Sequence, residues 1–340
     1  MWRTISSTVP RPQNWRSLDL TDFWQRPWLR LVICLLFSAS LSALLLGPQL
    51  HARFSATDDH ELLHVLGPKH ELPFREVGPA ILNTEVGKPG ESTRYRPVYY
   101  ALRVAEVSLW GDKPERYYAA RLALFAGLVL LLSWVATSAL GLVTGLLLTL
   151  VTFDFPMWGD IWARLGPAEQ YASMGTAVFL AGLAPIVKAW WSRARWPWSS
   201  SIVVMAGGFA VAAGSKENFV FLGLPLLIVT IYGVQQRLVS AKAMIIAALS
   251  LAFAAFVEVA AFLGVRALGA DIYGNGVSVA SRIGALGRFA ATILSLDRPL
   301  SMRHAAALLI GAVFIALMVA SGWTLRRKLE PHARSRFDRR

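Results

Sequence analysis

Long apolar runs constrain this chain more than any other feature of its sequence. Runs such as residues 29–47 and 243–264 match the length that an α-helix needs to cross a bilayer core of about 30 Å. The mean hydropathy is +0.47, and 55% of the 340 residues are hydrophobic. The 13 tryptophans also suit a membrane protein, because their amphipathic rings sit at the level of the lipid headgroups. The sequence therefore predicts an all-α polytopic membrane protein.

The net charge of +13 indicates membrane topology rather than binding to nucleic acid. Lysine and arginine cluster in the two termini and between apolar runs, as they do in cytoplasmic loops. We therefore expect no nucleic-acid partner. The single cysteine, Cys34, lies inside an apolar run, which excludes a disulfide framework and a thiolate zinc site. A mixed polar segment precedes the first run, so we expect that run to stay as an uncleaved membrane helix.

Eight membrane spans are predicted. The run at residues 122–153 is too long for one crossing, so we split it near Thr137 and Ser138 into two short spans with a tight turn. Eight spans place both basic termini in the cytoplasm, whereas an unsplit run would export the basic C-terminal tail. The predicted spans are 29–47, the two halves of 122–153, 171–190, 199–213, 218–232, 243–264 and 305–324.

This topology places the polar loops on the outer, extracytoplasmic side of the membrane. Within the large first loop, residues 97–110 repeat apolar residues at helical spacing, with Arg103 and Glu106 on the opposite face. The pattern predicts a juxtamembrane amphipathic helix that lies on the membrane, with a plain loop helix as the alternative. The predicted outer loops are residues 48–118, 154–170, 214–217 and 265–304.

The first outer loop contains a complete zinc-protease motif. His60, Glu61 and His64 are followed by Gly67 and His70, which gives H-E-x-x-H-x-x-G-x-x-H and resembles the metzincin signature. On a helix the first two histidines share one face, and the glutamate would be the general base for a zinc-bound water. However, a membrane span directly precedes the motif, and the nearest downstream methionine lies two spans away. A zinc metalloprotease is therefore the alternative hypothesis, beside histidines of a solvated loop.

A second hypothesis uses polar residues from several loops. An acidic pair, Asp58 and Asp59, follows the first span, and four further motifs follow in order: Tyr95-Arg96-Pro97, Gly111-Asp112-Lys113-Pro114 with Tyr117, Gly166-Pro167-Ala168-Glu169 and Ser215-Lys216-Glu217. This order resembles the GT-C membrane glycosyltransferases. The likeness is greatest to the polyprenol-dependent O-mannosyltransferase-like branch, which is related to proteins that carry tetratricopeptide repeats. The resemblance covers about residues 29–232, and no such repeats follow.

The resemblance implies transfer of a sugar from a polyprenyl-phosphate-linked donor to an acceptor on the extracytoplasmic side. Asp58 or Asp59 would take the proton of the acceptor, and the position in the family motif favours Asp58. Cations would stabilise the departing phosphate, for which arginine forks are suited, and carboxylates would orient these cations or bind sugar hydroxyls. The predicted substrate-binding residues are His60, Arg94, Arg96, Glu169, Lys216 and Glu217.

The resemblance leaves the partners of the protein partly open. Besides the bilayer and the lipid-linked donor, it implies an acceptor that is a protein, a lipid or a glycan, and the expected location is a bacterial cytoplasmic membrane. No particular cofactor is predicted, and a divalent metal ion stays open. A transporter or non-catalytic membrane protein is a third hypothesis, which the concentration of polar residues in outer loops disfavours.

The predicted domains follow from the spans and from the extent of the resemblance. The chain beyond residue 232 matches nothing in the family, so the protein is either a compact member or a truncated, inactive one. The four segments are a cytoplasmic N-terminal part, a GT-C-like catalytic core, further membrane helices and a basic cytoplasmic tail, at residues 1–28, 29–232, 233–324 and 325–340.

Overall fold

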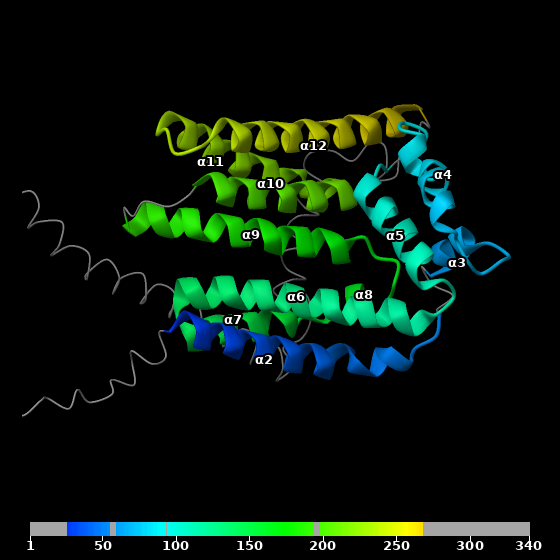
Figure 1. Ribbon diagram of the computed structural model, residues 1–340, viewed down its shortest axis with the longest axis horizontal. Coiled ribbons are helices and arrows are strands. Elements are labelled where there is room, and N and C mark those ends of the chain that lie inside the picture. The colour runs from blue at the N-terminus through cyan, green and yellow to red at the C-terminus, as the bar shows by residue number, and fades with distance from the viewer. Residues whose placement is uncertain (1–25, 55–58, 93, 193–197, 268–340) are drawn as a thin grey trace, which may run out of the picture.

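The computed structural model describes residues 26–54, 59–92, 94–192 and 198–267, and every regular element in these ranges is a helix. Six helical segments are long and apolar enough to cross a membrane, which confirms the predicted polytopic α-helical class. They lie side by side as one bundle (Figure 1). Their helices are α2 (Pro27–Leu46), α6 (Pro114–Leu140), α9 (Glu169–Ser192), α10 (Trp198–Ser215), η4 (Glu217–Leu222) with α11 (Gly223–Gln235), and α12 (Ala241–Ala267). The predicted span at 305–324 and nearly all of the predicted loop at 265–304 lie outside the described residues.

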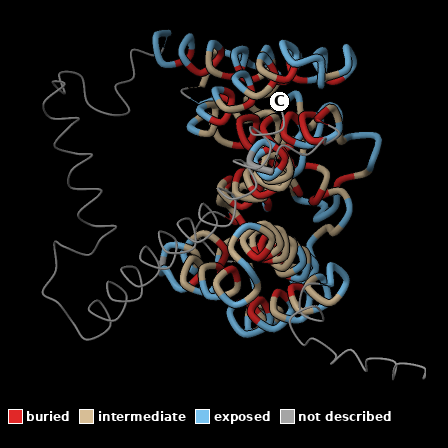
Figure 2. The backbone as a smooth tube through the Cα atoms, turned by 90° about the vertical axis from the view of Figure 1, so that its left-hand side faces the viewer, coloured by how far each residue is buried: buried red, intermediate tan, exposed pale blue. Residues whose placement is uncertain are grey.

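Glycines set the close packing of α9 against α10. A Cβ atom added at Gly175 would lie 2.7 Å from the carbonyl oxygen of Gly208, and one at Gly208 would lie 2.6 Å from that of Gly175. Only a hydrogen fits at such a contact, which is why small residues mark close helix pairs in membranes. Buried residues face the interior of the bundle in Figure 2, whereas large apolar side chains such as Leu224 and Leu249 are exposed on its outer faces. These outer faces are suited to lipid.

The predicted split of the long apolar run is confirmed, although the turn lies slightly later, at Gly141. Its φ of +88° belongs to the region that favours glycine, and it reverses the chain into α7 (Leu142–Phe153), which packs back along α6. Twelve residues rise only about 18 Å, so α7 alone is too short to be the predicted full span. The shorter helix α8 (Pro156–Trp162) continues the return towards α9.

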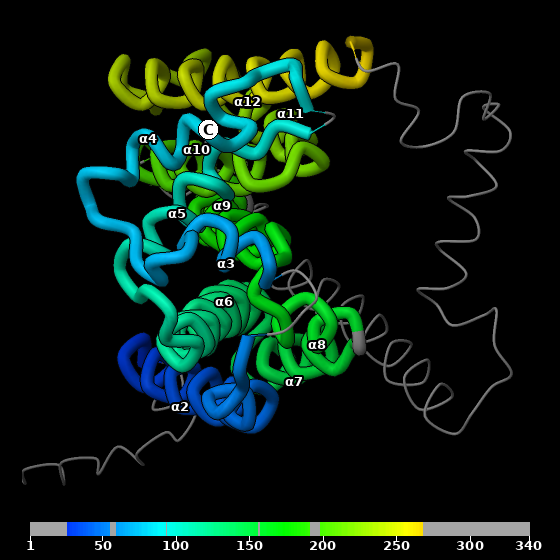
Figure 3. Tube along the Cα trace, turned by 90° about the vertical axis from the view of Figure 1, so that its right-hand side faces the viewer, coloured from blue at the N-terminus to red at the C-terminus, as the bar shows by residue number. Residues whose placement is uncertain are grey.

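Three helices of the first loop lie across one end of the bundle (Figures 1 and 3). Helix α5 begins and ends at the predicted residues, because Pro97 suits the first helical turn and Gly111, with a φ of +59°, suits its end. The three helices are α3 (His60–Leu66), α4 (Val77–Leu82) and α5 (Pro97–Trp110), with short 3₁₀ turns η1 (Gly47–His51), η2 (Phe74–Glu76) and η3 (Glu85–Gly87) between the longer elements.

The predicted orientation of α5 is wrong. Its charged face does not point away from the membrane helices, because Arg103 is 1% exposed and Glu106 is 9% exposed. Both side chains interact inside the protein, where Glu106 pairs with Arg121 of α6. Hydrophobic periodicity identified the helix, but its polar face is buried against another polar group rather than in contact with water.

Labelling of introduced cysteines would test the topology. The positive-inside pattern places the end with α3–α5 outside, so a membrane-impermeant thiol reagent should label Glu91→Cys in intact cells. It should label Gln236→Cys, at the opposite end of α11, only after the membrane is permeabilised. Both positions are exposed, and the native Cys34 is fully buried and should stay unlabelled. Labelling of Gln236→Cys but not of Glu91→Cys in intact cells would reverse the topology.

Candidate functional site

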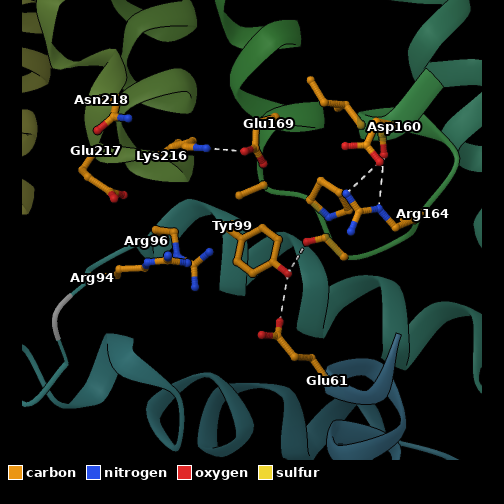
Figure 4. A pocket seen from close by; sticks show the side chains of 14 residues that line it. Glu61, Arg94, Arg96, Tyr99, Asp160, Arg164, Glu169, Lys216, Glu217 and Asn218 are labelled. Atoms are coloured by element: carbon orange, nitrogen blue, oxygen red, sulfur yellow. Dashed lines mark hydrogen bonds and ion pairs between the residues drawn. The ribbon is translucent and has the colours of Figure 1, made fainter. Parts of the chain in front are cut away.

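A cavity of about 370 Å³ lies at the end of the bundle that α3 and α5 cover (Figure 4). Four separate parts of the chain contribute to its wall, and four of the lining side chains are cations and four are carboxylates. The charged lining residues are Glu61 of α3, Arg94 and Arg96 before α5, Asp160 and Arg164 from the α8 region, and Glu169, Lys216 and Glu217 at the ends of α9, α10 and η4.

The cavity brings together five of the six residues that the sequence predicts to bind substrate. They come from three loops that are far apart in the chain, and Figure 4 shows their side chains around one space. The five are Arg94, Arg96, Glu169, Lys216 and Glu217. The sixth, His60, is exposed at the start of α3 and does not line the cavity. Their chemical roles remain predictions.

Three of the four cations in the wall are paired with carboxylates. Lys216 pairs with Glu169, which joins the ends of α10 and α9. Arg164 pairs with Asp160 at 3.1 Å, one turn apart. The Arg94 side chain has no hydrogen bond or ion pair with any residue that the structure describes, so it is the wall cation that is available to a ligand.

Arg96 is held rigidly at the edge of the cavity. Its Nε donates to Glu85 Oε1 at 3.1 Å, its Nη2 donates to the Tyr100 hydroxyl at 3.3 Å, and its guanidinium lies 5.0 Å from the centre of the Tyr99 ring. Burial raises the pKa of Glu85, and the adjacent Arg96 guanidinium opposes that shift. Sequence reasoning missed Glu85, because it lies in a loop and belongs to no motif.

Tyr99 connects α5 to two other parts of the wall. Its hydroxyl lies 2.7 Å from the carbonyl oxygen of Gly166 and 3.0 Å from Glu61 Oε2. A hydroxyl has one hydrogen, so these two acceptors compete for it. The same tyrosine therefore links the loop before α9 with α3. Glu61, which the sequence suggested only as the base of a zinc protease, is a carboxylate of the cavity wall.

The structure describes only one member of the predicted acidic pair, Asp59. Asp58, the favoured general base, lies outside the described residues. Asp59 is fully buried and does not line the cavity, and its Oδ1 accepts a hydrogen bond from the backbone N–H of Leu165 at 3.3 Å. This bond fixes the loop that carries Gly166. Asp59 is thus positioned to support the wall rather than to meet a substrate in the cavity.

The histidines of the zinc-protease motif do not form a metal site. His60, His64 and His70 are exposed, and His70 lies beyond the glycine that ends α3, with a φ of 54°. Across the described ranges, no group of three or more His, Cys, Asp or Glu side chains is placed to hold a metal ion. Helix α3 places His60 and His64 one turn apart, but His70 does not lie in a common metal site with them.

A buried ionic cluster lies between α5, α6 and α9. Arg121 donates two hydrogen bonds to the Glu106 carboxylate, from Nη1 at 2.7 Å and from Nη2 at 2.6 Å. The same carboxylate accepts from Arg103 Nη1 at 3.3 Å and from the Tyr171 hydroxyl at 2.5 Å. Burial disfavours the charged form of Glu106, but the two guanidiniums and the tyrosine outweigh it and hold its pKa below the usual range. No sequence motif marks this cluster, although Arg121 within an apolar helix is a signal of a functional or buried polar site.

The chain matches no protein-family profile, no curated protein and no solved structure. The functional assignment therefore depends on the order of the motifs and on the cavity where several of them meet. The wall combines several carboxylates with Arg94, which has no ion pair in the part of the chain that the structure describes, so it offers binding groups for an anion and acceptors for a proton.

Substitution of Asp59 would separate a supporting role from a catalytic one. Asp59→Asn keeps an oxygen that accepts from Leu165, so both the fold and any activity should stay near those of the wild type. Asp59→Ala leaves a buried N–H without its acceptor and should cost about 1–3 kcal/mol of unfolding free energy. Thermal unfolding in detergent would measure the difference. A folded Asp59→Asn variant without activity would contradict the supporting role.

The pH dependence of stability should show the contribution of Glu106. Its pKa in the folded protein lies below the reference value of 4.5, so its stabilising effect is present above about pH 4.5 and is lost as the pH falls through the folded value. Glu106→Gln lacks this effect at every pH. Its stability should therefore fall less than that of the wild type between about pH 7 and about pH 3.5. Equal losses in the two proteins, measured by thermal unfolding, would show that Glu106 is not ion-paired.

Proposed function

We propose that this protein is a membrane glycosyltransferase of the GT-C kind, which uses a polyprenyl-phosphate-linked sugar on the extracytoplasmic side of a bacterial cytoplasmic membrane. The observation that carries this proposal is the convergence of Arg94, Arg96, Glu169, Lys216 and Glu217 on one cavity at one end of a membrane bundle. Such a position suits a lipid-linked donor, whose tail stays in the bilayer while its phosphate and sugar lie at the surface.

In the proposed reaction, an acceptor hydroxyl oxygen attacks the anomeric carbon of the donor sugar. The bond between that carbon and the phosphate oxygen breaks, polyprenyl phosphate leaves with the bonding electrons, and a carboxylate takes the hydroxyl proton. Arg94 has no ion pair within the described ranges, so it is free to contact the phosphate, and Arg96 stands two residues further along the same wall. Fixed cations of this kind stabilise the charge that develops on the departing phosphate.

The carboxylates of the cavity have different availability. Glu169 is neutralised by Lys216, and Asp160 is paired with Arg164. Among the described residues, Glu61 accepts a hydrogen bond from the Tyr99 hydroxyl and has no ion pair, and Glu217 lines the cavity without an ion pair. These two carboxylates are available to bind sugar hydroxyls. Asp58, close before Glu61 in the chain, remains the predicted general base.

A transporter is the second candidate function, and the position of the charged groups argues against it. Transporters bind their substrates near the middle of the membrane, often where helices are broken. The charged cavity instead lies where the ends of α9, α10 and η4 meet the helices that cover the bundle. Extraction of labelled lipid-linked sugar without release of polyprenyl phosphate would favour a transport or carrier function.

Replacement of Asp58 would test the general base. Asp58→Asn keeps the size of the side chain but cannot accept a proton at neutral pH, so turnover should fall by roughly 10²–10⁴-fold while donor binding survives. The measurement is the release of polyprenyl phosphate by the purified, folded protein at saturating donor. Asp154→Asn is the matched control, because Asp154 is exposed and lies outside the cavity wall. Wild-type turnover in Asp58→Asn would remove Asp58 from the mechanism.

Replacement of Arg96 should act on both binding and turnover. Arg96→Ala removes a cation from the phosphate side of the cavity and leaves the buried Glu85 without its partner. Donor affinity and turnover should therefore both fall, whereas Arg116→Ala, at an exposed position on α6, should change neither. No release of polyprenyl phosphate from any lipid-linked sugar by the wild-type protein, under conditions where it is folded, would refute the glycosyltransferase assignment.

A further inference from the structure

The ionic cluster between α5, α6 and α9 carries one more positive charge than negative charge. Arg103 and Arg121 are each 1% exposed, and within the described part of the chain Glu106 is the only carboxylate that pairs with them. Tyr99 and Tyr171, which also contact the arginines, do not supply a negative charge, because a tyrosine is neutral well above pH 7 and burial raises the pKa of Tyr99 further.

The excess charge is not neutralised by other polar groups around it. Nε and Nη2 of Arg103 and Nε of Arg121 are buried without hydrogen-bond partners in the described residues. A buried guanidinium with free donors keeps its full charge, since arginine does not lose its proton in proteins. In surroundings of low polarity, the field of such a charge extends further than it does in water.

One aromatic ring separates this charge from the cavity. The Arg103 guanidinium lies 5.3 Å from the centre of the Tyr99 ring, and Tyr99 lines the cavity. Arg96 lies 5.0 Å from the same ring centre, so two cations share Tyr99 along one face of α5. The tyrosine hydroxyl points to Glu61, as Figure 4 shows, and also lies 2.7 Å from the carbonyl oxygen of Gly166 in the cavity wall.

We propose that the excess charge of the Arg103–Glu106–Arg121 cluster makes the cavity selective for a ligand with a phosphate group. The cluster does not touch the ligand. It acts through its electrostatic field, and Glu106 sets the size of that field by cancelling one of the two arginine charges. The inference rests on the proposed function in one respect, because the polyprenyl-phosphate headgroup is the phosphate source that it favours.

Two substitutions in the cluster should change phosphate binding in opposite directions. Arg103→Gln lowers the net charge of the cluster to zero and should weaken binding of farnesyl phosphate, whereas Glu106→Gln raises it and should strengthen binding. A unit charge acting over about 10 Å, the distance across the Tyr99 ring into the cavity, at an effective dielectric constant of about 20 shifts affinity by on the order of tenfold. The full-length protein in nanodiscs is titrated with farnesyl phosphate, with its uncharged analogue farnesol and with inorganic phosphate.

The controls separate the field of the cluster from surface charge and from loss of structure. Arg116→Gln removes an equal charge from an exposed position of α6, where water and salt screen it, and should change affinity by less than about twofold. Farnesol affinity should stay constant in every variant. Arg103→Lys keeps the charge and should bind farnesyl phosphate like the wild type. If Glu106→Gln does not fold, the affinities of Arg103→Lys and Arg103→Gln are compared instead.

Clear outcomes would overturn the inference. The first is a change of farnesyl phosphate affinity in the same direction in Arg103→Gln and Glu106→Gln. The second is wild-type affinity in Arg103→Gln. The third is an equal loss of affinity in Arg103→Lys and Arg103→Gln. Strong binding of inorganic phosphate with the same opposite shifts would support the inference but assign the site to free phosphate. Opposite shifts without any sugar release would refute the proposed glycosyltransferase and leave the phosphate selectivity in place.

Discussion

The arrangement of the cavity depends on the interaction of Glu106 with Arg121. A buried ion pair adds little net stability, because the cost of removing both charges from water offsets their attraction. Its geometry is nevertheless specific, since the two parallel hydrogen bonds fix α5 in one register against α6. Tyr171 joins the same carboxylate, so α9 is fixed as well. Sliding of α5 would leave buried charges without partners, and that penalty keeps the helix in place.

The loop before α9 is held by two contacts that depend on this placement. Asp59 accepts from Leu165, and the Tyr99 hydroxyl lies against the carbonyl oxygen of Gly166. Between them these bonds connect α3, α5 and the start of α9. The cavity wall is therefore assembled from loops, but its position is set by hydrogen bonds to buried or half-buried side chains rather than by the loops themselves.

The sequence predicted the helices well and the contacts of individual side chains less well. The spans and α5 follow from apolar periodicity and from terminal signals such as Pro97 and Gly111, which are local properties. The predicted substrate-binding residues Arg94 and Lys216 line one cavity, as expected for loops on the same side of the membrane. The burial of Arg103 was not predictable, because periodicity shows that a face is polar but not what covers it. Only the tertiary structure separates Asp59 from the cavity.

The short helix α7 has a consequence for the surrounding lipid. α12 contains 27 residues and rises about 40 Å, whereas α7 contains 12 and rises about 18 Å. The exposed apolar side chains of α7, such as Val143 and Leu147, end at Asp154, which is exposed. If α7 begins at the membrane surface, a hydrocarbon core of about 30 Å would bury that carboxylate, unless lipid beside α7 and α8 is thinner or allows water to enter. We therefore expect the protein to deform its membrane on one side, next to the helix that supplies Asp160 to the cavity.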